Sequence, residues 1–93
     1  METFTVRVQL RNADSSNYEI LHQQMELHGY ERIVVSSEGI SYHLPEAEYN
    51  HKSDKTTEDV IDEVYNIAKL IVSRPKVLVT RSKGRMWKGL EAE

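Results

Sequence analysis

The sequence predicts an α+β fold with a single domain, and three observations support this. The chain has 93 residues, enough for one modest core. Some segments alternate apolar and polar residues, as strands do, whereas others repeat apolar residues every three to four positions, as helices do. These segments run strand, helix, strand, strand, helix, strand, which is the order of a ferredoxin-like βαββαβ sandwich. Such a sandwich has a four-stranded antiparallel sheet with two helices on one face.

The first strand is expected over residues 3–10, where the alternation is strict. Its apolar side, which would pack on the helices, consists of Phe4, Val6, Val8 and Leu10. Its other side, with Thr5, Arg7 and Gln9, would lie on the sheet face that no helix covers. An uncovered face is often completed by a partner, so we also expect a symmetric homodimer.

A helix is expected over residues 16–28. Ser16 and Glu19 have the spacing of a capping box, in which a hydroxyl and a carboxylate satisfy the first free amides of a helix. Leu21 and Met25 lie on one face of this segment. Gly29 is expected to end the helix, because glycine tolerates the left-handed conformation that follows a last turn.

The middle of the chain offers more strands than the predicted fold needs. Residues 31–36 are rich in β-branched side chains and predict the second strand. Residues 40–44 and 47–51 both alternate, and the periodicity does not choose between them for the third strand.

The second helix is expected to begin at a cap on Thr56 or Thr57. Its apolar face consists of Val60, Val64, Ile67, Ala68 and Ile71. Pro75 marks its end, and residues 76–81 predict the last strand. We therefore divide the chain into a ferredoxin-like domain over residues 1–82 and a basic, then acidic, partly flexible tail over residues 83–93.

Composition excludes several classes of function. The absence of cysteine rules out disulfide frameworks, thiol catalysis and the common zinc sites. No apolar run could span a membrane and no signal peptide is visible, so a cytoplasmic protein is expected. Glycine-rich phosphate loops are missing, and His22 and His28 do not share a helical face. We therefore expect no cofactor and no metal site.

Charge is distributed unevenly along the chain. Residues 1–73 contain 6 Lys/Arg against 13 Asp/Glu, a net of −7, and residues 74–93 contain 6 against 2, a net of +4. Such a basic block attracts phosphate or an acidic protein surface, although it could also be a solvated tail. Trp87 among these cations is typical of a base-stacking platform or of an aromatic that closes the edge of the core. The candidate RNA-binding residues are Arg81, Lys83, Arg85, Trp87 and Lys88.

The polar residues that remain could support metal-independent acid–base cleavage of RNA. Histidine can move the proton of a 2′-hydroxyl, and an arginine can stabilise the charge on phosphorus. The candidate catalytic residues are His22, Tyr49 and Arg7. Each also has a structural interpretation: a solvated histidine, a packed tyrosine and a cross-strand ion pair.

A set of spaced residues resembles the GhoS-like family of antitoxin endoribonucleases from type V toxin–antitoxin systems. It consists of Ser15-Ser16-Asn17-Tyr18, Met25, Gly29-Tyr30, Ile33, Gly39-Ile40, Leu44 and Tyr49. The resemblance implies a ferredoxin-like fold, related to small CRISPR-associated nucleases, and cleavage of single-stranded messenger RNA. The implied partners are a toxin's messenger RNA or the toxin protein.

Two positions of the resemblance bear on the site. Tyr49 matches a functional aromatic of the family, which favours residues 47–51 as the third strand. His22 stands where a family member has arginine, so a permanent cation is replaced by a titratable group. Two functions therefore remain: an endoribonuclease, or a non-catalytic module that binds nucleic acid or protein through its open sheet face and basic C-terminus.

Overall fold

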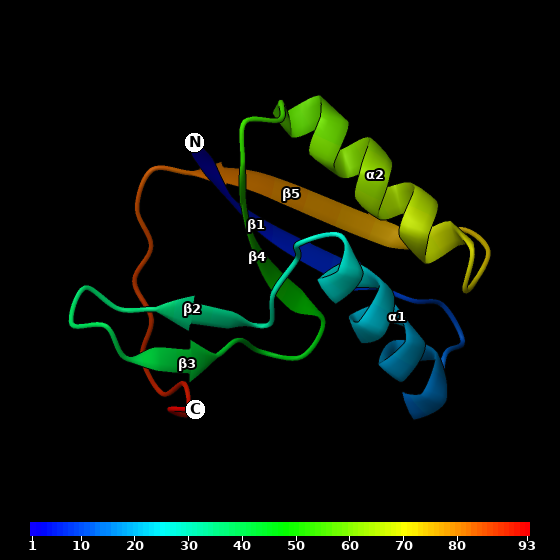
Figure 1. The fold of residues 1–93 in the computed structure, drawn as a ribbon. Coiled ribbons are helices and arrows are strands. Elements are labelled where there is room, and N and C mark those ends of the chain that lie inside the picture. The colour runs from blue at the N-terminus through cyan, green and yellow to red at the C-terminus, as the bar shows by residue number, and fades with distance from the viewer.

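The computed structural model describes residues 1–93 and has the α+β architecture that the sequence predicts. The elements are β1 (Glu2–Gln9), α1 (Ser15–Leu27), β2 (Ile33–Val35), β3 (Ser41–His43), β4 (Glu48–Ser53), α2 (Thr57–Lys69) and β5 (Lys76–Ser82). All strand pairs are antiparallel. Both helices lie on one side of the main sheet (Figure 1). Neither helix combines the length and apolar character that crossing a membrane requires.

The strands form two sheets instead of the expected single sheet of four. The main sheet has the order β4-β1-β5, and β2 pairs with β3 in a separate hairpin. One bridge, between Glu31 and Asn50, holds the start of this hairpin beside β4. Both segments that competed for the third strand are therefore strands. β4 joins the main sheet, whereas β3 continues the hairpin away from it.

Local capping fixes where each helix begins. Thr56 caps α2, as predicted, by accepting a hydrogen bond from the Asp59 amide at 3.0 Å. The prediction that Ser16 caps α1 was wrong. Asp14 is the cap, and it exchanges hydrogen bonds with Asn17, each 3.1 Å long. Gly29 follows α1 with a φ of +86°, as expected for the residue that ends a helix.

The core fills the space between the main sheet and the two helices. Phe4, Val6 and Val8 of β1 are buried there against Leu21 of α1 and Val64 of α2. The residues between them on β1 point to the other face, which no helix covers. The alternation predicted for the first strand is therefore confirmed.

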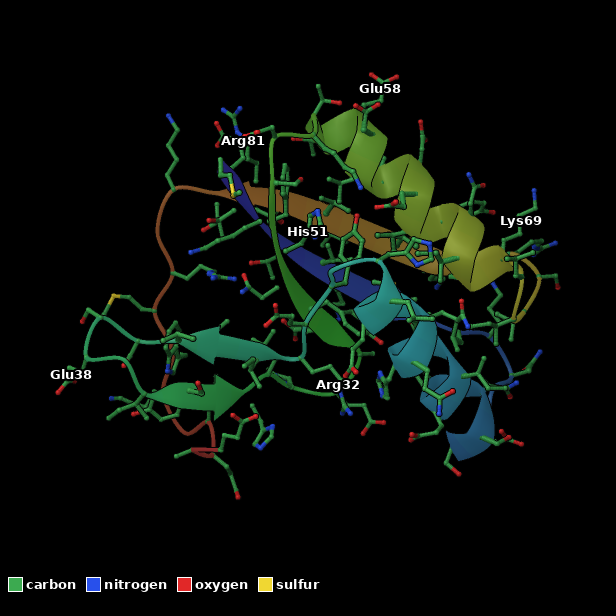
Figure 2. The ribbon with its side chains drawn as sticks, viewed as in Figure 1. Arg32, Glu38, His51, Glu58, Lys69 and Arg81 are labelled. Carbon is green, nitrogen blue, oxygen red and sulfur yellow. The ribbon has the colours of Figure 1, made fainter.

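The buried side chain of His51 forms hydrogen bonds and a stacking contact with neighbouring parts of the chain. His51 of β4 lies between the sheet and the helices, whereas Arg81 and Glu58 lie at the periphery (Figure 2). Its Nδ1 lies 2.9 Å from the Gly29 carbonyl oxygen, and its Nε2 lies 3.0 Å from the Ser53 hydroxyl. Its ring stacks on Tyr30 at a centroid distance of 4.0 Å. Both nitrogens therefore have partners, which fits a structural role.

The last residues of the chain return across the uncovered face of the sheet. This C-terminal strap, residues 83–93, leaves β5 and ends beside the hairpin (Figure 1). The His43 amide donates to the Glu91 carbonyl, and the Glu93 amide donates to the Ser41 carbonyl, both at 2.9 Å. The end of the strap therefore pairs with β3 along the edge of the hairpin that β2 leaves free.

Candidate functional site

Two of the three predicted catalytic residues meet, and they meet inside the protein. His22 of α1 and Tyr49 of β4 share a hydrogen bond of 2.6 Å between Nδ1 and the hydroxyl. The side chains are 6% and 0% exposed. Burial, reinforced by the positive charge of Arg32, lowers the pKa of His22. Burial also raises the pKa of Tyr49, so both groups are neutral near pH 7.

The third predicted catalytic residue lies on the other side of the sheet. Arg7 follows Val6 in β1, and consecutive strand residues point to opposite faces. Arg7 is exposed and stands opposite Glu48 in the strand register. The sheet therefore separates Arg7 from the buried pair, and the three residues do not form one surface.

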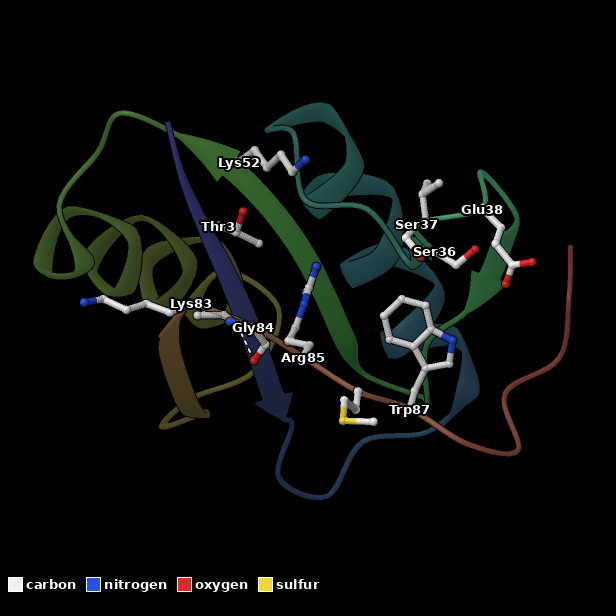
Figure 3. Close-up of a pocket in the computed structure, with 12 residues that line it drawn as sticks. Thr3, Ser36, Ser37, Glu38, Lys52, Lys83, Gly84, Arg85 and Trp87 are labelled. Carbon is white, nitrogen blue, oxygen red and sulfur yellow. Dashed lines mark hydrogen bonds between the residues drawn. The ribbon is translucent and has the colours of Figure 1, made fainter.

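The open face of the sheet carries a polar depression of about 680 Å³, which we call the basic groove. It is bounded by the starts of β1 and the strap, the end of β4 and the tip of the hairpin (Figure 3). Its lining consists of Thr3, Val35, Ser36, Ser37, Glu38, Lys52, Ser82, Lys83, Gly84, Arg85, Met86 and Trp87.

Three cations line this groove, and only one acid does. Lys83 and Arg85 come from the strap, Lys52 comes from β4, and Glu38 is the acid. Arg85 lies over β1 and β4, where one of its guanidinium nitrogens donates to the Thr5 hydroxyl at 3.2 Å (Figure 3). No carboxylate forms an ion pair with it. Burial lowers the pKa of Arg85, and no neighbouring acid offsets that effect.

Trp87 forms one wall of the groove. Its ring packs edge-on against Tyr42 of β3, with a centroid distance of 5.8 Å and an interplanar angle of 60°. In Figure 3 the indole lies beside Ser36 at the hairpin tip. The side chain is partly exposed, so the strap holds an aromatic ring next to the three cations.

The structure divides the predicted RNA-binding residues between different surfaces. Lys83, Arg85 and Trp87 line the basic groove. Arg81 belongs to the helix-facing side of β5, and its Nε lies 3.9 Å from a carboxylate oxygen of Glu2. Lys88 lies just outside the groove, in an adjoining depression with Leu44 and Pro45 that shares Arg85 and Trp87 with the groove.

Sequence reasoning missed Lys52, although the signal for it was present. Lys52 alternates with the buried Tyr49 and His51 along β4, so it must point to the open face. The alternation identifies this face, but only the folded strap shows which cations lie near Lys52.

No protein-family model matches the chain, and no curated protein matches it.

Proposed function

We propose that the protein binds single-stranded RNA in the basic groove. The observation that carries this proposal is the half-buried Arg85, which has no acidic partner and lies with two lysines beside a partly exposed Trp87. Such cations attract phosphate groups, and an aromatic ring lets an unpaired base stack on it. RNA offers both groups within one nucleotide.

The remaining lining of the groove suits the same ligand. Thr3, Ser36 and Ser37 supply hydroxyl groups, which can hydrogen-bond to phosphate oxygens and to the ribose 2′-hydroxyl. The chain as a whole has a net charge of −3, which repels RNA. The groove, with three cations and one acid, is a place where RNA would be attracted instead.

We infer that the scaffold beneath this groove is a ferredoxin-like sandwich with a reduced fourth strand. The strand order β4-β1-β5 and the bridge from Glu31 to Asn50 support this inference, because they place the start of the hairpin next to β4. In this interpretation the rest of β2 has left the sheet and forms the far wall of the groove.

The test is RNA affinity measured by fluorescence anisotropy. Labelled single strands of about 12 nucleotides are compared with duplexes of equal length at about 50 to 200 mM salt. The single strand is expected to bind more tightly, with an affinity that falls as salt rises. The triple variant Lys52→Gln/Lys83→Gln/Arg85→Gln is expected to lower affinity at least about tenfold.

The matched control neutralises cations that lie outside the groove. Lys69→Gln/Arg74→Gln/Lys76→Gln removes the same number of charges away from the groove and is expected to change affinity less than about twofold. Equal losses in the two variants, or no binding by the unchanged protein, would refute the proposal. In that case an acidic protein surface becomes the better candidate for the open face.

Endoribonuclease activity is the second candidate. It rests on the GhoS-like resemblance, and it requires RNA to reach His22 and Tyr49, which share a 2.6 Å bond and are buried in the folded chain. The target implied is a toxin's messenger RNA in the cytoplasm. Cleavage that persists in EDTA and disappears in His22→Asn would support this candidate. If the RNA stays intact on a denaturing gel, RNA binding without cleavage remains as the proposed function.

A further inference from the structure

The outer edge of β5 is a long strand edge that the rest of the chain leaves unpaired. β5 is the last strand in the order β4-β1-β5, and it lies at the margin of the sheet in Figure 1. The backbone hydrogen bonds outside the helices and strands do not involve residues 76–82. At the opposite margin, β4 is bridged by Glu31. A seven-residue edge with free amide groups is a template for another strand.

The hydrogen-bond pattern shows which residues present their backbone groups at this edge. The Val8 amide donates to the Ala47 carbonyl at 3.0 Å, so Val8 and its alternate neighbours in β1 turn toward β4. The residues between them turn toward β5, where their partners are Lys76, Leu78, Thr80 and Ser82. The residues whose N–H and C=O groups point outward are therefore Val77, Val79 and Arg81.

We propose that two copies of the chain pair through these edges, antiparallel, with Val79 opposite Val79 of the second copy. Val77 then lies opposite the second copy's Arg81, and all three outward residues find hydrogen-bond partners. Sliding the register by two residues one way puts Arg81 opposite Pro75, which has no N–H. Sliding it the other way puts Val77 opposite Lys83, which lies beyond the strand.

The side chains beside the edge suit this register. Leu78, on the open face, is 63% exposed and would be covered by the second copy. On the helix side, Ile61, Asp62 and Tyr65 of α2 line a depression together with Val77. The register brings the second copy's Arg81 next to Val77, so its guanidinium would approach the exposed carboxylate of Asp62.

Sedimentation of the full chain over a concentration series tests this proposal. The variants reverse the charges of Arg81 and Asp62, first singly and then together. The unchanged protein is expected to form dimers, and Arg81→Glu or Asp62→Arg is expected to raise the dimer dissociation constant at least about tenfold. The double variant Arg81→Glu/Asp62→Arg is expected to recover most of that loss. Lys88→Glu, which also replaces a cation with a carboxylate but lies on the strap, is expected to leave dimerisation unchanged.

Amide hydrogen exchange of the unchanged protein gives a second readout that needs no variant. The amides of Val77, Val79 and Arg81 are expected to exchange more slowly as protein concentration rises. A monomeric mass at every concentration, or exchange of these three amides that is independent of concentration, would overturn the proposal. Val77, Val79 and Arg81 do not line the basic groove, so either result is separate from the RNA-binding test.

Discussion

The two faces of the main sheet are built from the same three strands, but polar groups are buried and paired on one face and accessible on the other. On the helix side, His22, Tyr49 and His51 are buried, and each has a hydrogen-bond partner. On the open side, Arg85 and Lys52 line a groove and have no acidic partner. Burial makes the first group structural, because a paired neutral residue supports packing better than it meets a substrate. The uncompensated charge of the second group is available to a ligand.

Of the variants considered, Tyr49→Phe should change the free energy of unfolding most. It tests whether the buried polar residues on the helix side contribute to stability but not to RNA binding. Tyr49→Phe removes the hydroxyl and leaves the buried His22 Nδ1 without a partner, at a cost of about 1–3 kcal/mol in unfolding free energy. RNA affinity should stay unchanged. Urea denaturation and anisotropy measure the two quantities. Tyr65→Phe, at an exposed tyrosine of α2, is the control and should change neither.

The converse test removes the aromatic wall of the groove. Trp87→Ala should weaken binding of single-stranded RNA by about 1–3 kcal/mol, since a base loses its stacking partner. Met86→Ala changes the neighbouring side chain, which is 98% exposed, and should have a much smaller effect on RNA affinity. Equal losses from the two variants would mean that stacking on the indole is not what binds the strand.

A smaller effect is expected from shortening the strap. Deleting Glu91–Glu93 removes the two backbone bonds to β3, each of which contributes about 0.5–1.5 kcal/mol. The hairpin then holds Trp87 less firmly, so RNA affinity should fall several-fold while the main sheet stays folded. Far-UV circular dichroism checks the fold. An affinity equal to that of the full chain would show that the groove does not need this contact.

The smallest expected effect is a dependence of stability on pH that originates on the helix side. The pKa of His22 in the folded protein lies below its ordinary value of 6.5, so the unfolded chain takes up a proton first as pH falls. The stability contribution is complete above pH 6.5 and is lost as pH drops through the folded-state pKa. Unfolding free energies measured between about pH 7 and pH 5 should therefore decline, and more steeply than in His22→Asn.

The carboxylate of Glu63 gives stability a second, separate pH dependence at lower pH. Burial alone would raise the pKa of Glu63, but hydrogen bonds from Lys55 and Tyr30 outweigh it and hold the pKa below its usual 4.5. Its contribution is present above pH 4.5 and is lost only as pH falls through the lower folded value. A slope seen only below pH 4.5 would contradict the assignment to His22.

Many of the helices and strands can be predicted from local patterns in the sequence. The alternation from Phe4 to Val8 predicts β1, and the spacing of Val60, Val64 and Ile67 predicts the buried face of α2. These patterns succeed because one side chain in every repeat must reach the core, whatever the rest of the chain does. The position of Tyr49 within β4 likewise follows from alternation.

The candidate site is much harder to predict, because its parts are far apart in the chain. His22 looked like a solvated helix residue, and its burial depends on the contact with Tyr49, 27 positions away. Lys52 joins Arg85 only because the strap turns back after β5. No local period encodes that turn.

Local patterns in the sequence are enough to predict the α+β class, the helices and strands of the core, and the basic character of the C-terminal segment. Only the folded chain shows that β2 pairs with β3 outside the main sheet, that the strap crosses the open face, and that the groove includes Lys52. The physical reason is that periodicity reports which side of an element is buried. Contacts such as that between Arg85 and Thr5, 80 residues apart, depend on the whole chain folding at once.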